Sequence, residues 1–309
     1  MSVSRRIVLK TGAAALAASA IPAGLATTPV WAKSALTMGE VKIDVLSDGN
    51  LRLPINGFIP DAPAEELAAL LKKYNIPTDA LEPDCNLTLM RDGKNTVLFD
   101  VGAGTNFMPS AGKIGAAMEE FGLDPSDVTH VVFTHAHPDH LWGLMDDFDE
   151  PVFPEAEYMI SKAEWDYWID PATVDKINEA RKSFAAGAKR NLESIEDKIT
   201  RFNFGEEILP GIQAMDTSGH TPGHTSYEIR SGSESLVVIG DAITNQAVSF
   251  EKPGWRSGSD QDGEQGIATR KMLLDRLASE KMHLVGFHLP YPGIGYAEKK
   301  DDAYRFVAA

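Results

Sequence analysis

Four side chains that can bind a metal ion fall within six consecutive residues, and they limit the folds open to this chain more than any other feature. They are His135, His137, Asp139 and His140. The preceding run 131–133 (VVF) is apolar and β-branched and predicts a buried strand, and 141–145 (LWGLM) predicts the first turns of a helix. We expect the cluster on a strand-to-helix turn, where a rigid scaffold can aim several side chains at one point.

Strand signals come first and helix signals follow in each half of the chain, roughly 33–150 and 151–309. Clear helical patterns cover 64–74, 113–121, 162–169 and 267–280. No low-complexity linker separates the halves, and this order favours two sheets packed face to face with helices outside. The sequence therefore predicts an α/β (α+β) protein, with residues 33–309 as one αββα sandwich of two mixed sheets.

The charge and the cysteine content exclude several kinds of partner and site. A formal net charge of -16 argues against nucleic acid, because phosphate binding needs Lys and Arg. Cys85 is the chain's one cysteine, so no disulfide forms within the chain and a zinc site built from several cysteines is excluded. We expect Cys85 to be a small, partly buried filler residue.

The first residues carry the pattern of an export signal. Arg5 and Arg6 precede apolar residues, a weakly hydrophobic, Ala-rich run follows over 11–25, and a small-x-small cleavage site ends at Ala32. Segment 1–32 resembles a twin-arginine signal peptide, and a membrane-spanning helix is disfavoured because the run is short and contains proline and glycine. We expect a periplasmic or secreted protein, with the twin-arginine export machinery as a partner.

Three later residues can complete the cluster. His220 lies in a glycine-rich loop, Asp241 directly follows an apolar strand pattern, and His288 follows another. A single histidine after a strand is more often structural, so it is the combination with the first cluster that indicates a metal site. A carboxylate beside histidines can bridge two cations. The second histidine of the loop, His224, is expected to brace the loop through hydrogen bonds.

With these positions added, the pattern resembles the dinuclear branch of the metallo-β-lactamase superfamily. Within that branch the chain is similar to the methyl parathion hydrolase group, which comprises exported phosphotriesterases and related lactone and aryl-ester hydrolases. The similarity rests on 46–49 (LSDG), 100–104 (DVGAG), 134–144, 209–212 (LPGI), 219–225 and 288–295 (HLPYPGIG). The resemblance implies a metal-dependent hydrolase with the αββα fold.

The resemblance also implies a role for each residue of the pattern. One metal ion would be bound by His135, His137 and His220, a second by Asp139, His140 and His288, and Asp241 would bridge the two. The two divalent ions are expected to be zinc, with manganese, cobalt and iron left open, and a metal-bridging hydroxide would attack the substrate. Asp241 and Asp139 are the candidate catalytic residues, and Asp100 is expected to hold the loop of the site.

The substrate class follows from the same resemblance. Phe107, Trp168 and Phe184 match aromatic positions that line a leaving-group pocket, although each could also be an ordinary core residue. The predicted function is hydrolysis of a small neutral ester, either an organophosphate triester or an aryl ester, with a lactonase or arylesterase as the alternative. A β-lactamase and a non-catalytic metal-binding protein are weaker hypotheses. A small-molecule ester is thus the expected partner, and a homodimer is left open.

Overall fold

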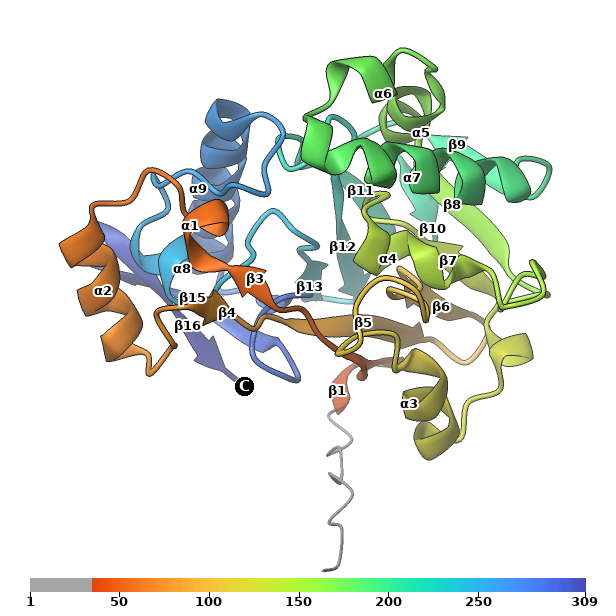
Figure 1. Ribbon diagram of the computed structural model, residues 1–309. Helices are drawn as coiled ribbons and strands as arrows, with labels where there is room; N and C mark the ends of the chain where they lie inside the picture. The colour runs from red at the N-terminus through yellow and green to blue at the C-terminus, as the bar shows by residue number, and fades with distance from the viewer. Residues whose placement is uncertain (1–34) are drawn as a thin grey trace, which may run out of the picture. The chain divides into compact units, whose positions relative to one another are not determined.

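Two seven-stranded sheets pack face to face in the described part of the chain, residues 35–309 of a computed structural model (Figure 1). The first sheet has the order β1 (Ala35–Met38), β2 (Val41–Asn50), β5 (Asp84–Arg91), β6 (Thr96–Phe99), β7 (His130–Val132), β8 (Glu157–Ser161) and β9 (Ile199–Phe202). Its strands are antiparallel from β1 to β6 and parallel from β6 to β9. The export signal expected over residues 1–32 lies outside the described residues.

The second sheet takes up the C-terminal third of the chain. Its order is β10 (Glu207–Leu209), β11 (Ile212–Asp216), β12 (Thr225–Ser231), β13 (Glu234–Val238), β14 (His283–Val285), β15 (Ile294–Lys300) and β16 (Ala303–Ala308). Neighbouring strands are antiparallel except β13 and β14, which are parallel. A two-stranded sheet joins β3 (Leu53–Pro54) to β4 (Ala80–Leu81).

The division between the two sheets corrects one expectation. The sequence placed the boundary near residue 150, but the structure places it between Phe202 and Glu207. The reason is that β8 and β9 extend the parallel part of the first sheet, so the helical segment between them belongs to the first half. The αββα arrangement itself is confirmed.

Helices cover the outer faces of both sheets (Figure 1). They are α1 (Ile55–Phe58), α2 (Ala64–Lys73), α3 (Ile114–Phe121), α4 (Pro138–Leu141), α5 (Lys162–Ile169), α6 (Thr173–Lys176), α7 (Lys182–Ser194), α8 (Val248–Glu251) and α9 (Gly263–Glu280). The helices predicted from periodicity correspond to α2, α3, α5 and α9. In the part of the chain that the structure describes, no helix is both long and apolar enough to cross a membrane.

Alternation along the strands builds a separate core on each face of the first sheet. In β6, Val97 and Phe99 belong to the core between the two sheets, whereas Leu98 belongs to the outer core under α3, α5 and α7. This is what the two-residue period of a strand dictates when both faces are covered. A third core, which includes Leu273 and Leu277 of α9, lies on the outer face of the second sheet. The strand ends are therefore the part of each sheet that is free to carry polar side chains.

Candidate metal centre

The first four candidate ligands follow strand β7 as the sequence predicted. His135 and His137 lie in the loop after β7, and Asp139 and His140 lie in the short helix α4 that begins at Pro138. Proline suits the first turn of a helix because its missing N–H has no partner there in any case. All four side chains are buried or nearly so.

The other three candidates reach the same place from the second sheet. Asp241 and His288 come after β13 and β14, whose parallel pairing puts their carboxyl ends at one edge. His220 comes from the loop between β11 and β12. The two sheets therefore bring all seven candidate ligands to one edge of the sandwich, and this group of seven is called the rim.

Three imidazoles form one group within this rim. His135 Nε2 lies 3.0 Å from His137 Nδ1, and His220 Nε2 lies 2.8 Å from the same atom. Ligand atoms of all three lie within 4.8 Å of one another. Burial lowers the pKa of His135 and of His137, which keeps both rings neutral and their lone pairs available to a cation.

Carboxylates dominate the other half of the rim. His288 Nε2 lies 3.2 Å from Asp139 Oδ2, and His140 Nε2 lies 3.5 Å from that oxygen and 3.3 Å from Asp241 Oδ1. The second oxygen of Asp241 is 3.2 Å from His220 Nε2 and 3.3 Å from His288 Nε2. Asp241 therefore lies between the two groups, and His140 is as close to Asp241 as to the Asp139 with which the sequence paired it.

Several buried atoms in this rim have no hydrogen-bond partner among the described residues. Those that face other candidate ligands are Asp139 Oδ2, His140 Nε2 and Asp241 Oδ1, which make only the ion-pair contacts given above. A buried polar atom left unpaired costs about 1–3 kcal/mol, and more when it is charged. Imidazole nitrogens and carboxylate oxygens are together the donor set of zinc and similar divalent ions. The unpaired atoms and the donor set therefore both fit a pair of bound cations.

The charge balance points the same way. Burial disfavours charge on His140, but the carboxylates of Asp139, Asp241 and Asp100 outweigh burial and raise its pKa. Burial also disfavours charge on His288, but the carboxylates of Asp241 and Asp139 outweigh burial and raise its pKa. A rim in which carboxylates are strong enough to hold protons on buried histidines is one that attracts cations.

Comparison with known proteins agrees with this geometry. The model of the metallo-β-lactamase superfamily matches residues 82–275, a range that includes every candidate ligand except His288. The chain belongs to the metallo-β-lactamase superfamily. The fold is shared with the solved structure of AidC, a dizinc quorum-quenching lactonase in complex with a product, at 27% identity over 90% of this chain and 97% of that one, with a TM-score of 0.85.

A second solved structure in the superfamily is equally similar. The hydrolase AbOPH is 28% identical, with 91% of this chain and 98% of that chain covered and a TM-score of 0.85. The chain spans about half the length of the curated relatives it matches first, such as 56% of a probable metallo-hydrolase of Mycobacterium bovis. That match is 26% identical over 182 residues, 52% of this chain. The family model nevertheless matches more than half of this chain, residues 82–275.

Asp100 holds one candidate ligand, His140, from behind, as expected. Its Oδ2 accepts hydrogen bonds from His140 Nδ1 and Thr134 Oγ1, both at 2.8 Å, and its Oδ1 accepts from the Thr134 backbone N–H at 2.7 Å. Because Nδ1 of His140 donates to this carboxylate, Nε2 is the nitrogen that faces the rim, where a bound cation would take the place of its proton.

Glu164 is a buried carboxylate that the sequence analysis missed. Its Oε1 accepts from the Ala136 backbone N–H at 2.9 Å and from the indole of Trp168 at 2.6 Å. Its Oε2 accepts from Thr221 Oγ1 at 2.6 Å and from the Gly223 backbone N–H at 3.0 Å. One side chain thus fixes the loop between His135 and His137 to the loop that carries His220.

The close contact between Glu164 and the loop that carries His220 also requires a glycine in that loop. A Cβ atom on Gly223 would lie 2.0 Å from the backbone nitrogen of Glu164, so only glycine lets the loop approach α5 so closely. The sequence signal was therefore present in the loop, but nothing near it indicated which acid the loop would meet.

Two further contacts orient ligands from the second sheet. His220 Nδ1 lies 3.3 Å from Asp260 Oδ1, and the other oxygen of Asp260 accepts from Arg270 at 2.7 Å. His224 Nδ1 is 2.9 Å from Thr217 Oγ1, and its Nε2 accepts from the Asp241 backbone N–H at 2.9 Å. Burial lowers the pKa of His224 to about 3, so the ring stays a neutral acceptor. His224 braces the loop and Asp241 together, in line with the expectation.

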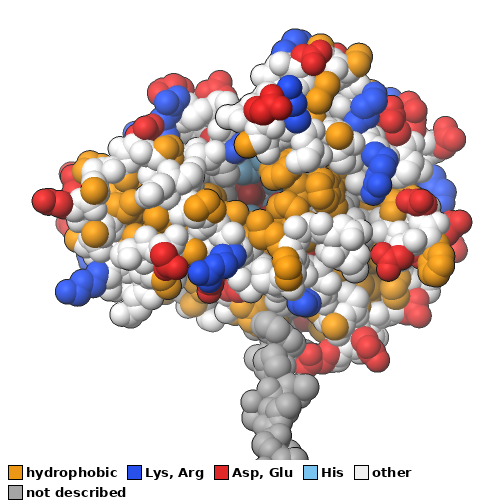
Figure 2. Space-filling model, in the orientation of Figure 1, with side chains coloured by type: hydrophobic (Ala, Val, Ile, Leu, Met, Phe, Trp, Pro, Cys, Tyr) orange, Lys and Arg blue, Asp and Glu red, His pale blue; other side chains and the backbone are white. Residues whose placement is uncertain are grey.

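A cavity of about 350 Å³ opens onto the rim. Its apolar wall consists of Leu51, Leu53, Pro54, Phe58, Phe107 and Phe184, and its polar lining includes His137, Asp139, His220, Asp241, His288, Arg181 and Ser259. Figure 2 shows this hollow, with a hydrophobic wall beside histidine and acidic side chains. Phe107 and Phe184 pack edge to face with ring centroids 5.9 Å apart.

Trp168 does not line this cavity, unlike the other two aromatic candidates. Its side chain is 1% exposed and lies behind His137, with ring centroids 5.9 Å apart. The physical reason is the hydrogen bond from its indole N–H to Glu164, which turns the ring into the protein. Leu51, Leu53 and Phe58 take part in the wall instead, and the sequence analysis predicted none of them.

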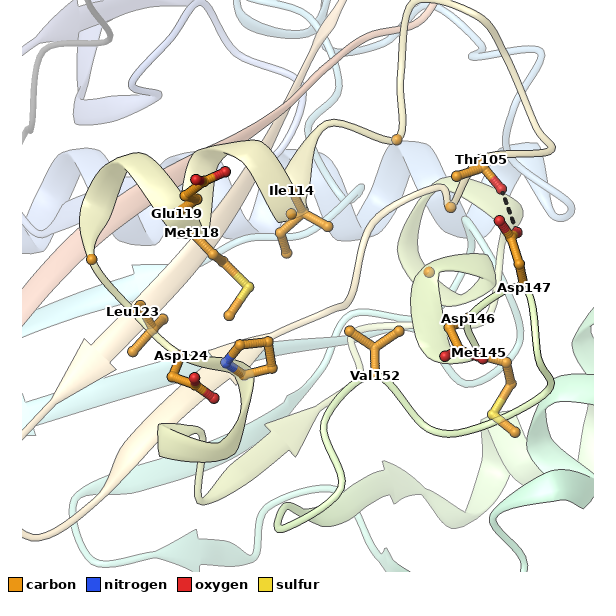
Figure 3. A pocket seen from close by; sticks show the side chains of 16 residues that line it. Thr105, Ile114, Met118, Glu119, Leu123, Asp124, Met145, Asp146, Asp147 and Val152 are labelled. Atoms are coloured by element: carbon orange, nitrogen blue, oxygen red, sulfur yellow. Dashed lines mark hydrogen bonds between the residues drawn. The ribbon is translucent and has the colours of Figure 1, made fainter.

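A larger cavity of about 650 Å³ lies elsewhere, between α3 and the segment 145–152 (Figure 3). It is lined by apolar residues such as Ile114 and Met118 and by acidic residues at its edge. One of these acids, Asp147, accepts a hydrogen bond from Thr105 at 3.3 Å. None of its lining residues is a candidate ligand, so cavity size alone does not identify the site of chemistry.

Proposed function

We propose that this metallo-hydrolase uses two divalent cations to cleave small neutral esters, with lactones as the preferred class. The observation that carries the proposal is the cavity over the rim, which is apolar along one wall and ends at the candidate ligands. An acyl chain would lie along Leu53, Phe58 and Phe107, and the ester carbonyl would face the cations. AidC, which shares the fold over 90% of this chain, is described as a lactonase.

The proposed division of ligands follows the two groups in the rim. His135, His137 and His220 would hold one ion, and Asp139, His140 and His288 would hold the other. Asp241 would bridge the two, since its oxygens lie 3.3 Å from His140 Nε2 and 3.2 Å from His220 Nε2. Zinc suits these nitrogen and oxygen donors best, and manganese, cobalt and iron remain in the proposal.

The protein's own residues position the substrate and move the proton. Two bound divalent cations would supply an activated water and polarise the ester carbonyl. Asp139 would hold a cation through one carboxylate oxygen, and its other oxygen could accept the proton of the attacking water and return it to the alkoxide that leaves when the ester bond breaks. Arg181, the only Lys or Arg among the described residues that line the cavity, donates to the Gly258 carbonyl at 2.7 Å and would offer a donor to a polar substituent of the substrate.

Aryl esters and organophosphate triesters form a second candidate class. Phe107 and Phe184 present aromatic faces and edges beside His137, whose ring centroid lies 5.9 Å from that of Phe184. Such a wall suits a phenol leaving group. The sequence resemblance to the methyl parathion hydrolase group points to the same class. The lactone is preferred because the lactonase shares nearly its whole length with this chain.

The test is a substrate panel on the metal-reconstituted protein. Acyl lactones of increasing chain length, aryl esters, a phosphotriester and a penicillin would be ranked by kcat/KM. We expect lactones first, with values that rise with acyl length until the apolar wall is filled. Turnover of the penicillin alone would overturn the substrate class, and full activity after complete metal removal would overturn the dinuclear mechanism.

We also propose that the protein is exported. The support is the twin-arginine pattern of residues 1–32, with Arg5 and Arg6 as its determinant. Changing both arginines to lysine should retain the protein inside the producing cell, as measured by fractionation. Unchanged secretion of that variant would contradict the route.

A further inference from the structure

Cys85 lies beside two of the candidate ligands, Asp139 and His288, a position that a residue with only a packing role would not need. It is the second residue of β5, it is 0% exposed, and its Sγ lies within 4.8 Å of a ligand atom of Asp139 and of His288. Two donors on one tetrahedral zinc ion lie about 3.6 Å apart, from Zn–S of about 2.3 Å and Zn–N or Zn–O of about 2.1 Å. The three atoms would therefore share one cation after closing by about 1.2 Å at most.

The position of Cys85 relative to His288 is fixed from both sides. Asp84, just before it, accepts a hydrogen bond on its backbone oxygen from His288 Nδ1 at 2.8 Å. Asn86, just after it, donates its backbone N–H to the Phe287 carbonyl at 2.9 Å. The side chain of Asn86 also donates to the Leu289 carbonyl at 2.6 Å. The thiol is thus held against the ligand segment by contacts that involve its two neighbours in β5.

A second observation points to a ligand at this spot. Asp139 Oδ2 is buried and lies 3.2 Å from His288 Nε2, but it makes no well-aligned hydrogen bond among the described residues. His288 uses Nδ1 for the Asp84 carbonyl, so its Nε2 faces the same space as that oxygen. Sulfur, oxygen and nitrogen donors therefore converge on one point of the rim.

We propose that Cys85 is an additional ligand for the cation held by Asp139 and His288. Binding replaces the S–H proton with the cation and releases that proton to solvent, with no change of oxidation state. A thiolate makes this position softer than a site of nitrogen and oxygen donors alone, so it favours zinc and cadmium over manganese. The inference rests on the proposed function, because it needs a cation in that half of the rim.

Cobalt substitution tests the proposal without using activity. The chain has one cysteine, so any thiolate-to-cobalt charge-transfer absorption in the near ultraviolet must come from Cys85. We expect the protein loaded with two cobalt ions to show this absorption, and Cys85→Ser and Cys85→Val to lose it while retaining bound cobalt. The valine variant keeps the buried position filled if serine proves unstable there.

Competition between metals provides a second measurement. The preference for cadmium over manganese should fall about tenfold or more in Cys85→Ser. A wild-type protein that holds two cobalt ions without the absorption would overturn the inference and leave the proposed function intact. A wild-type protein that binds no cobalt would overturn both, and the metal content tells the two failures apart.

Discussion

The rim of candidate ligands and the apolar wall of the cavity are built in different ways. Ligands such as His140 and His220 contact a buried partner that orients them from behind, namely Asp100 and Asp260. The wall residues Phe107 and Phe184 make mainly edge-to-face ring contacts, with no comparable hydrogen bond. The contrast indicates that the position of the chemistry is fixed by the fold, whereas the shape of the substrate site depends on side-chain volume and can vary more freely.

The part of the wall at Phe58 packs on a small core that is attached to the rest of the fold more loosely. Helix α2 and its neighbours pack on Ala247 and Val248 in a small separate core. At the surface, Glu251 accepts hydrogen bonds from Lys73 and Tyr74, and Lys252 pairs with Glu66 at 2.8 Å. Surface pairs of this kind each contribute little, about 0–1 kcal/mol. Changes in the rim should therefore have much larger effects than changes in the wall.

The largest effect is expected for Asp241→Ala. Removing the carboxylate between the two groups should lower kcat/KM by about 1,000-fold or more, equivalent to about 4 kcal/mol of transition-state stabilisation. The variant should also bind fewer metal ions by elemental analysis. Asp302→Ala, an exposed acid in the turn between β15 and β16, is the matched control and should change neither quantity. Activity within tenfold of wild type would contradict a bridging role.

Glu164→Gln should come second. All four partners of Glu164 donate hydrogen bonds, so an amide NH2 group in place of one oxygen faces donors and leaves at least one of them unpaired. We expect a loss of about 2–3 kcal/mol in the free energy of unfolding and a 10–100-fold loss in metal affinity. Isothermal titration and urea unfolding would measure the two, with exposed Glu120→Gln as the control. Loss of stability with unchanged metal affinity would mean that Glu164 only holds the fold.

Substitutions in the wall should change selectivity more than rate. Phe184→Ala removes a ring that lines the cavity and packs on Phe107, so KM for long-chain or aryl substrates should rise about tenfold. The kcat for a short acyl lactone should change less than threefold. Trp168→Phe, which removes the hydrogen bond to Glu164 but is not part of the lining, should show the opposite pattern, with kcat and metal affinity reduced and chain-length preference unchanged.

The smallest effect is expected at the surface attachment of α2. Burial disfavours the charge on Glu251, but its hydrogen bonds with Lys73 and Tyr74 outweigh burial and lower its pKa. A carboxyl whose pKa is lowered by folding stabilises the protein above its unfolded pKa of about 4.3, and that contribution is lost as the pH falls through the folded pKa. Glu251→Gln should lower the free energy of unfolding by about 0.5 kcal/mol at pH 7. In urea unfolding the difference should shrink below about pH 4, and a difference that grew in acid would contradict this account.

The sequence predicted the rim better than its supports, for a physical reason. Ligands such as His135 and Asp241 follow strong apolar strand patterns, and their residue types are rare enough at strand ends to indicate chemistry. Glu164 and Asp260 lie in helical and loop segments where an acid usually faces solvent, and only tertiary packing makes them buried partners of the site. Their roles could not be predicted without knowing which loops the fold brings together.

The wall was predicted only in part for a related reason. Phe184 and Trp168 are both aromatic residues in helices of the same layer, and the sequence does not distinguish a ring that faces a cavity from one whose N–H is drawn inward. Cys85 was interpreted as filler because a lone cysteine in a strand usually is. Its proximity to Asp139 depends on the pairing of distant segments, which local patterns do not reveal.

The rim draws its candidate ligands from both sheets, four from the first and three from the second, and this has a consequence for how the chain resists unfolding. His137 and His220 are 83 residues apart in sequence, yet their nitrogens lie 2.8 Å apart. A cation held by both would act as a cross-link that closes a long loop, as a disulfide does elsewhere, and the entropy it removes from the unfolded chain grows with loop length. In a chain with one cysteine, bound metal would then take the place of a disulfide between the two halves. Removing the metal with a chelator should destabilise both halves, so that they unfold in one transition.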